Sequence, residues 1–198
     1  MRRNAVFGVR LDNVIAWGRR EALQIATADI GAIETEARGL IESAVREGTG
    51  LEEFERDFAD ALSARGLSPV APWHAETIFR TNSLSAYAGG EWANAKSLEA
   101  SGDIVAARYV AVLDDRTRPA HAAMDGWWGR LDDPVWETWW PPNGWNCRCF
   151  VVLLTQADVD ALGGWDAQPQ APAVFPDPGF DGNPGTGIWR IVSGSMVA

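Results

Sequence analysis

The pattern of apolar and polar positions divides the chain into a helical part and a part made of short strands and turns. Over the first hundred residues, apolar side chains recur at the three-, four- and seven-residue spacings of amphipathic helices. From Ala106 the spacing changes, and two short stretches rich in β-branched residues predict strands. We therefore expect an α+β fold, with an N-terminal helical region of about four helices (1–104), a small β-containing, loop-rich domain (105–163) and an extended Pro/Gly-rich tail (164–198).

The third predicted helix has the clearest signals at both ends. Its apolar residues follow the i, i+3, i+7, i+11 spacing of one buried face: Leu51, Phe54, Phe58 and Leu62. Thr49 and Glu52 predict a capping box at its start, and Gly66 is placed to end it in a left-handed conformation. The other helices are predicted over 11–27, over 33–47, and from Pro72 to about Ser101.

The long helix after Pro72 contains a pair of glycines, Gly89 and Gly90, in its interior. Each costs about 1 kcal/mol relative to alanine. The pair therefore indicates either a kink or the close approach of another backbone. The residues expected to share a face of this helix are Trp73, Ile78, Ser85 and Trp92.

Two strands frame the second region. Residues 107–115, "ARYVAVLDD", predict the first, and residues 147–155, "CRCFVVLLT", predict the second. The second is apolar on both faces after Cys149, which favours a central place in the sheet. Between them we expect a short helical turn ended by Gly126 and then a hairpin or loops, and after them a helix capped by Thr155.

Tryptophan is unusually frequent, with 11 in the chain. Six fall close together: Trp127, Trp128, Trp136, Trp139, Trp140 and Trp145. They either pack a core or form a contact surface. We expect a mixture of the two, because so many large rings in one small region can hardly all be buried.

The tail contains apolar residues that could anchor it on a surface: Phe175, Phe180, Trp189 and Ile191. Because they are spaced among prolines and glycines, we expect an extended segment that becomes ordered on assembly.

The charge balance bears on possible partners. The chain carries 27 acidic and 17 basic residues, a net charge of −10, and no long basic stripe of the kind that grips duplex DNA. Basic residues cluster only in the first 20 positions, whereas residues 29–60 are acidic. This asymmetry indicates either docking on a charged partner or a solvated helical face. No apolar run approaches the roughly 18 residues of a membrane span, and the start does not read as a secretory signal.

Candidate chemistry is concentrated between residues 109 and 152. His121, Cys147 and Cys149 are soft donors suited to zinc, with Asp114 or Asp125 as a fourth ligand. The C-x-C spacing is not the usual C-x2-C, and buried cysteines are often only small apolar side chains. The same Cys-His set with a carboxylate also suits a nucleophile in a small hydrolase. Because a disulfide between positions two apart would be strained, we expect free thiols.

A structural role is the interpretation that the residues themselves favour. Arg116 and Arg148 each carry a planar fork of donors suited to a buried carboxylate or to several carbonyl groups. Their available partners are Asp114, Asp125 and Asp132. Such a clasp would lock the corner "LDDRTRPAH" onto the strand that contains "NCRC".

Three stretches, "VLDDRTRPAHAAMDG", "DDPVW" and "PPNGWNCRCFV", resemble the head-morphogenesis domain of tailed-phage minor head proteins, the Mu protein F-like family. The upstream segments "AVREGTGLEEFERDFADALSARG" and "ETIFRTNSLSAYAGGEWANA" are also similar, as is "FDGNPG" in the tail, so the resemblance covers most of residues 30–185. The metal-ligand candidates within the motif are His121, Cys147 and Cys149. The remaining motif positions that we treat as structural are Asp114, Arg116, Thr117, Asp125, Gly126, Pro141, Pro142 and Arg148.

The resemblance implies a virion component rather than an enzyme. It implies a minor capsid protein that is assembled in the host cytoplasm and lies inside the head near the portal vertex, where it helps head assembly or DNA packaging and retention. The expected partners are the portal protein and, as a further partner, the major capsid or scaffold protein, with no membrane and no sequence-specific nucleic acid. The alternative is a small zinc- or thiol-dependent hydrolase that uses His121, Cys147 and Cys149.

The chain departs from those family members that carry a further Cys-x-x-Cys and a histidine before Cys-Arg-Cys. Arg118 and His121 occupy the two positions of the Cys-x-x-Cys pair, and Asn143 or Asn146 occupies the position of the later histidine. The departure lowers the case for a metal, so we expect no cofactor, with zinc as the candidate if one is bound. It also suggests that Arg118 replaces a metal bond with hydrogen bonds.

Overall fold

The structure is a computed structural model that describes residues 5–6, 9–10 and 31–186, with side chains over 36–186. The helix predicted over 11–27, the anchors Trp189 and Ile191, and the side chains of the basic cluster lie outside the described residues. At the start, β1 (Ala5–Val6) and β2 (Val9–Arg10) form a two-stranded antiparallel ribbon. The main body is α+β, as predicted, and its helices and strands follow from residue 31 onward.

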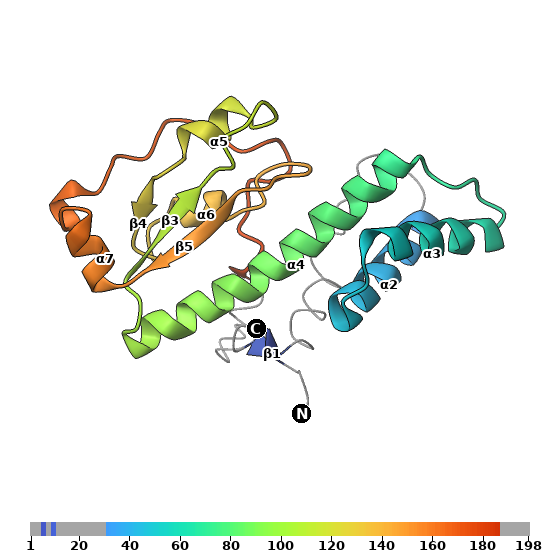
Figure 1. Ribbon diagram of the computed structural model, residues 1–198, viewed down its shortest axis with the longest axis horizontal. Coiled ribbons are helices and arrows are strands. Elements are labelled where there is room, and N and C mark those ends of the chain that lie inside the picture. Colours follow the sequence, from blue (N-terminus) through green and yellow to red (C-terminus); the bar gives the residue numbers. More distant parts are fainter. Residues whose placement is uncertain (1–4, 7–8, 11–30, 187–198) are drawn as a thin grey trace.

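Three helices form the first part of this body. They are α2 (Gly31–Glu47), α3 (Leu51–Ala64) and α4 (Pro72–Ser101), which confirms three of the predicted helices within a few residues. α4 crosses the molecule between the α2–α3 pair and the sheet (Figure 1). One core lies between the first half of α4 and the α2–α3 pair, and its largest members are Phe54, Phe58, Leu62, Ile41 and Ile78.

The buried face of α3 confirms the predicted spacing, but its predicted cap is wrong. The N-cap is Gly50, with extended backbone and no side-chain cap, and Phe54 N donates to its carbonyl oxygen at 3.0 Å. Thr49 therefore lies one residue too early for its hydroxyl to reach the third helical N–H. Gly66, with φ of 72°, ends the helix in the left-handed conformation that was expected.

α4 is one helix of 30 residues that continues through Gly89 and Gly90, both buried, and Figure 1 shows α4 without a sharp bend. The indole Nε1 of Trp140 donates to the carbonyl oxygen of Ala88 at 3.1 Å, so small residues on this face let a large ring reach the helix backbone. The predicted common face is wrong in part. Trp92 is buried, whereas Trp73 is 62% exposed, because it lies about 140° around the helix from the buried Ile78.

The second part contains a three-stranded antiparallel sheet in the order β4-β3-β5. β3 (Ala106–Val110) is the central strand, and β4 (Trp128–Gly129) pairs with one of its edges. β5 (Phe150–Leu154) pairs with the other edge, with Val110 opposite Phe150 at one end and Ala106 opposite Leu154 at the other. The central place predicted for residues 147–155 is therefore wrong. Phe150 and Val152 face outward, 47% and 42% exposed, while Val151 and Leu154 are buried.

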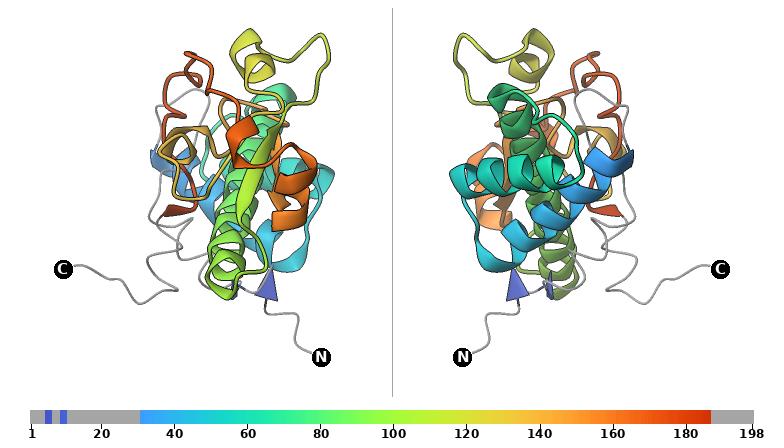
Figure 2. Two further views of the ribbon diagram at one scale, coloured as in Figure 1. Left: turned by 90° about the vertical axis from the view of Figure 1, so that its left-hand side faces the viewer. Right: turned by 90° about the vertical axis from the view of Figure 1, so that its right-hand side faces the viewer.

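Short helices connect and extend this sheet. α5 (Pro119–Ala123) and α6 (Trp136–Trp139) lie in the connections between strands, and α7 (Gln156–Ala161) follows β5. Thr155 caps α7 in a capping box with Asp158, which confirms the predicted cap. The corner that carries α5 projects at one end of the molecule (Figure 2).

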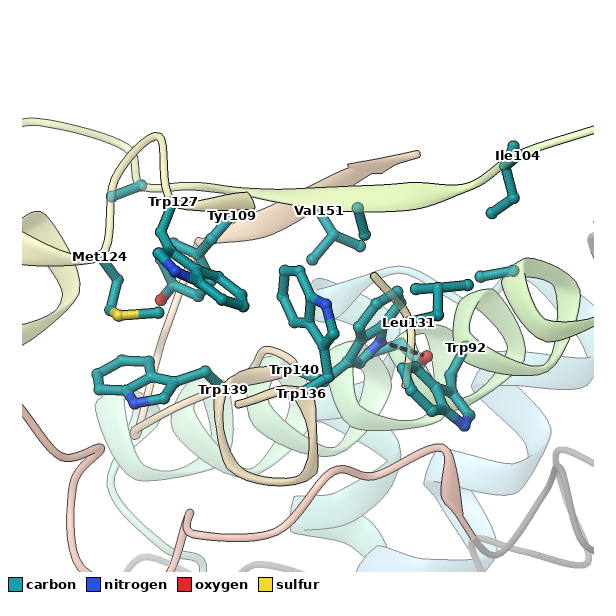
Figure 3. Close-up of a cluster of buried hydrophobic side chains, with 14 residues drawn as sticks. Trp92, Ile104, Tyr109, Met124, Trp127, Leu131, Trp136, Trp139, Trp140 and Val151 are labelled. Atoms are coloured by element: carbon teal, nitrogen blue, oxygen red, sulfur yellow. Dashed lines mark hydrogen bonds between the residues drawn. The ribbon is translucent and has the colours of Figure 1, made fainter. Parts of the chain in front are cut away.

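The tryptophan cluster is a core, not a mixture of core and contact surface. Five of the six clustered tryptophans are buried: Trp127, Trp128, Trp136, Trp139 and Trp140. The rings of Trp127, Trp136, Trp139 and Trp140 fill the space between the sheet and the second half of α4 (Figure 3). Trp128 belongs to a separate small cluster with Leu154 and Val159. Trp140 packs edge-to-face on Trp92 with ring centroids 4.7 Å apart, and Trp127 packs so on Trp136 at 4.9 Å. Only Trp145 is half-buried, and its ring contacts Phe180 of the tail.

The tail begins with a short 3-10 helix (Trp165–Ala167) and then runs along its own domain. Asn183 N donates to Glu137 O at 2.7 Å, and Asn183 Nδ2 donates to Trp136 O at 3.0 Å. A Cβ at Gly185 would lie 2.2 Å from Cβ of Trp92, so only glycine fits against α4 there. Residues 165–186 therefore make contacts within their own domain, although Phe175 is 82% exposed. Ordering of the tail on assembly stays a prediction.

α4 belongs to both cores, so the predicted boundary at residue 104 follows the end of a helix rather than a gap between packed units. The three-part division of the chain stays a prediction.

Across the described segments, every helix is too short or too polar to cross a membrane.

Replacing Trp136 by alanine is expected to lower the free energy of unfolding by about 3–5 kcal/mol, because the ring is fully buried and its loss leaves a cavity. Urea denaturation followed by circular dichroism measures this change. Trp73→Ala is the matched control and should change stability by no more than about 0.5 kcal/mol, since the ring is largely exposed. Equal losses in the two variants would contradict a tryptophan core.

Candidate functional site

The residues that the sequence singled out gather where the corner at 111–126 meets the segment 141–149. His121 lies on α5 and is 2% exposed. Cys147 is buried and Cys149 half-buried, and both lie just before β5. Positions far apart in the sequence thus meet because β3 and β5 pair along their whole length and bring their flanking segments together.

Residues with restricted backbone or fixed hydrogen bonds shape the corner. Pro119 begins α5, where its missing N–H costs nothing. Asp125 Oδ1 accepts a hydrogen bond from Ala111 N at 2.8 Å, which fixes the two ends of the corner. Gly126 has φ of 79°, and its N–H donates to Tyr109 O at 2.9 Å. Asp125 and Gly126 therefore shape the turn that holds His121.

The imidazole of His121 faces both cysteines with the same ring nitrogen. Nδ1 lies 3.6 Å from Cys147 Sγ and 3.6 Å from Cys149 Sγ. The three donor atoms all lie within 4.8 Å of one another. Both cysteines are free thiols, as predicted. The structure therefore brings the whole predicted soft-donor group together.

The pKa values of the two thiols are shifted in opposite directions. The hydrogen bond from the Cys147 thiol lowers the pKa of Cys149, burial opposes that change, and hydrogen bonds with His121 and Tyr109 support it. The same bond to Cys149, together with burial, raises the pKa of Cys147. The hydrogen bond between the two thiols thus favours loss of a proton from Cys149 over loss from Cys147.

The other nitrogen of the His121 ring faces the tail. Nε2 is buried without a hydrogen-bond partner among the described residues, and Asp177 Oδ1 lies 3.9 Å from it. Asp177 Oδ2 forms an ion pair with Arg118 Nε at 2.7 Å, and Arg118 Nη2 donates to Trp145 O at 2.8 Å. The bond to Trp145 is a hydrogen bond of the kind that the sequence suggested for Arg118. A Cβ at Gly144 would lie 2.3 Å from Asp177 Oδ2, so this close approach requires glycine.

Arg148 forms the clasp predicted with Asp114. Its two terminal nitrogens lie 2.7 Å from the two carboxylate oxygens of Asp114, a bidentate pair. This bond lowers the pKa of Asp114 and raises that of Arg148. Thr117 donates to Val112 O and also contacts Asp114, so it holds the acidic turn in place.

Of the other proposed clasp partners, Arg116 contributes only a long ion pair and its backbone N–H, which donates to Asp114 Oδ1 at 3.0 Å. Arg116 is 74% exposed, and its guanidinium is 3.7 Å from Asp114. Asp132 is exposed, and within residues 36–186 no ion pair joins it to Arg116 or Arg148. Among the described residues, the group of close ligand atoms contains neither Asp114 nor Asp125, the acids that the sequence suggested as a fourth ligand. Asp114 is paired with Arg148, and Asp125 accepts from a backbone N–H.

The segment from Pro141 to Asn146 is held by side-chain amides. Pro141 and Pro142 are buried and joined by a cis peptide bond. Asn143 is fully buried; its Oδ1 accepts from Tyr109 Oη at 3.0 Å, and its Nδ2 donates to Thr138 O at 3.1 Å. Asn146 Nδ2 donates to Thr77 Oγ1 at 3.0 Å and so ties the segment to α4. Asn143 and Asn146, one of which the sequence suggested in place of a metal-binding histidine, are thus both held by hydrogen bonds within the fold.

A wide groove of about 830 Å³ lies between the first half of α4 and the corner. Four arginines line it, Arg80, Arg116, Arg118 and Arg148, together with the exposed side chains of Trp73 and Leu84. A much smaller cavity of about 10 Å³ adjoins His121, Cys147 and Cys149. It has room for about one water molecule.

Sequence reasoning missed Asp177 and the groove. Asp177 lies in the turn Pro176-Asp177-Pro178-Gly179, next to the tail segment "FDGNPG", and that adjacency is the only local signal for it. Trp73 and Arg80 lie on α4, far in sequence from the corner arginines, and no local pattern links them.

Comparison with known proteins supports the sequence resemblance. Residues 35–152 match the family described as "Phage Mu protein F like protein". The chain is 34% identical over 166 residues to the "Putative capsid assembly protein F" of Escherichia phage Mu, covering 75% of this chain and 37% of that protein. It is 33% identical over 154 residues to the "Mu-like prophage FluMu F protein" of Haemophilus influenzae, covering 72% of this chain and 37% of that protein. The match thus spans just over a third of each relative, and no solved structure matches the chain.

Asp114→Asn is expected to lower the melting temperature at pH 7, because an amide loses the charge-assisted pair with Arg148. The pair holds the pKa of Asp114 below its unfolded value of about 3.9. Its stabilisation is therefore present above about pH 4 and is lost as the pH falls towards the folded pKa. The difference in melting temperature between wild type and variant should shrink between pH 7 and about pH 2.

Asp115→Asn is the control, because it removes the neighbouring carboxylate and leaves the bidentate pair intact. If the two variants lost the same stability at pH 7, general charge rather than the clasp would be responsible.

Proposed function

Because the chain belongs to the Phage Mu protein F-like family, we propose that it acts as a minor capsid protein in phage head assembly, through contacts with other head proteins. The name of the phage Mu relative, a putative capsid assembly protein, supports this role. It also favours a structural rather than an enzymatic function.

The groove between α4 and the corner is the observation that carries the proposal. The chain as a whole is strongly acidic, yet four arginines from three separate segments converge on this one surface. Arginine and tryptophan are the residue types that most often dominate the binding energy of protein interfaces. The tryptophan-rich loops, which the sequence suggested as anchors, are buried, so Trp73 on α4 takes that place.

The charges of the groove indicate the chemistry of its occupant. Arg80, Arg118 and Arg148 are already paired with Glu76, Asp177 and Asp114. Arg116 is 74% exposed and makes only a long contact, so it is the arginine most available to a partner. We assign the groove to an acidic segment of another head protein, with an apolar side chain that packs on Trp73 and Leu84.

We place this contact on the portal protein, inside the head near the portal vertex, with the major capsid or scaffold protein as a further partner. Assembly would take place in the host cytoplasm. A role in packaging or retaining DNA then follows from position at the portal rather than from DNA binding, because the overall charge of −10 opposes a DNA-binding surface.

The hydrolase alternative has less support. A hydrolase needs room for a substrate next to its nucleophile, and the cavity beside Cys147, Cys149 and His121 has a volume of about 10 Å³. That space admits about one water molecule. The wide groove runs past the outer side of the corner, where arginines rather than the thiols line it.

Arg116→Glu is expected to weaken binding to the portal protein of the same phage by at least about tenfold, because it opposes the acidic segment in the groove. Trp73→Ala should weaken binding to a similar degree without loss of the fold. The assay is surface plasmon resonance or pull-down with the full chain and the purified portal protein.

The matched control is Arg56→Glu, because Arg56 is exposed on α3 and lies outside the groove. Portal binding that is unchanged in both groove variants would overturn the assignment. Salt-sensitive binding of wild type to duplex DNA, lost in Arg116→Glu, would instead identify a nucleic-acid surface.

A further inference from the structure

The contact between His121 and the two cysteines is more symmetric than hydrogen bonding requires. Nδ1 carries either one lone pair or one proton, so it forms one full hydrogen bond. It nevertheless lies 3.6 Å from each of two sulfur atoms. A single cation between the three donor atoms would satisfy both contacts at once.

The separations match tetrahedral zinc. Zn–S bonds of about 2.3 Å and Zn–N bonds of about 2.0–2.1 Å, at a tetrahedral angle, place sulfur and nitrogen about 3.6 Å apart. Both observed separations between Nδ1 and Sγ have this value. Two thiolates and an imidazole are soft donors that select Zn²⁺ over Mg²⁺ or Ca²⁺. The donor set and its spacing therefore fit the ion.

The rest of the His121 ring is also arranged as in a metal site. Histidines that bind a metal through one nitrogen usually donate the other N–H to a carboxylate, which fixes the ring. Here Nε2 is buried without a hydrogen-bond partner in residues 36–186, and the carboxylate of Asp177 is 3.9 Å away. Arg118, and the space left by Gly144, hold Asp177 in that place. A shift of about 1 Å would complete the hydrogen bond.

The fourth position faces the small cavity. Among the described residues, the group of candidate ligands contains only His121, Cys147 and Cys149. The adjoining cavity of about 10 Å³ accommodates about one water molecule. Water is therefore the fourth ligand that the space allows.

We propose that His121, Cys147 and Cys149 bind one Zn²⁺ ion, with water as the fourth ligand, and that Asp177 of the tail is a positioning residue that orients His121. The ion joins α5 to the segment before β5, and Asp177 extends that link to the tail. Because Asp177 lies outside residues 35–152, the site includes a residue beyond the region matched to the family. The inference does not depend on the function proposed above.

The first test measures metal content. The full chain is purified with reduced thiols, stripped with a chelator, and titrated with Zn²⁺ and separately with Co²⁺. We expect one Zn²⁺ per chain by elemental analysis, a higher melting temperature with zinc, and the strong thiolate-to-cobalt absorption of a tetrahedral site. His121→Ala and Cys149→Ser should each lose stoichiometric binding, whereas His74→Ala, which changes the other histidine, should retain it.

The second test addresses Asp177. Asp177→Ala is expected to weaken zinc affinity by about 10–100-fold while one ion still binds at saturation with an unchanged cobalt spectrum. Asp181→Ala, an exposed acid of the same tail, should leave the affinity unchanged. Equal losses in the two variants would remove the positioning role.

A folded wild-type chain with both thiols reduced that binds no zinc would overturn the proposal, even if the variants fail to fold. Zinc binding that persists in both His121→Ala and Cys149→Ser would overturn it as well. Portal binding is measured separately, so failure here is distinguishable from failure of the proposed function.

Discussion

The structure depends on the burial of a tryptophan cluster between a very small sheet and the second half of α4. Three strands of two to five residues cannot enclose a core by themselves, so α4 supplies the second layer and the indole rings fill the space between. Trp140 is fixed in this core by ring contacts and by its hydrogen bond to Ala88. The segment that carries the two cysteines begins directly after Trp140, so the core sets where those cysteines lie.

Polar contacts then fix the fine geometry of the corner. One arginine, Arg148, joins the cysteine segment to Asp114, and another, Arg118, joins the corner to Asp177 in the tail. Each pair links segments that are distant in the sequence, which is how a loop-rich region with few ladder hydrogen bonds keeps one shape. The same arginines, with Arg80 and Arg116, give an acidic protein one locally basic groove.

Local patterns predicted the elements well and their contacts poorly. The spacing of Phe54, Phe58 and Leu62 was sufficient to predict α3 and its buried face, because helix periodicity depends only on residues that are close together in the sequence. The edge position of β5 was missed, because an apolar run does not reveal which neighbour a strand lacks. The burial of the tryptophans was missed because it depends on α4, which precedes them by many residues.

The candidate site shows the same division. Sequence alone selected His121, Cys147 and Cys149 from residue chemistry, and it named Asp114 and Arg148 among the candidate residues of a clasp. It did not find Asp177, because the contact of the tail with the corner is long-range and the adjacent segment "FDGNPG" does not indicate which residues the tail contacts.

Native-state hydrogen exchange reports whether α4 and the loop-rich region form one cooperative core. We expect the indole N–H of Trp140, the amides of β3 and those of residues 88–95 to exchange with one common, near-global free energy of opening. Rapid exchange of the Trp140 indole and of β3, while the α4 amides remain protected, would contradict this expectation.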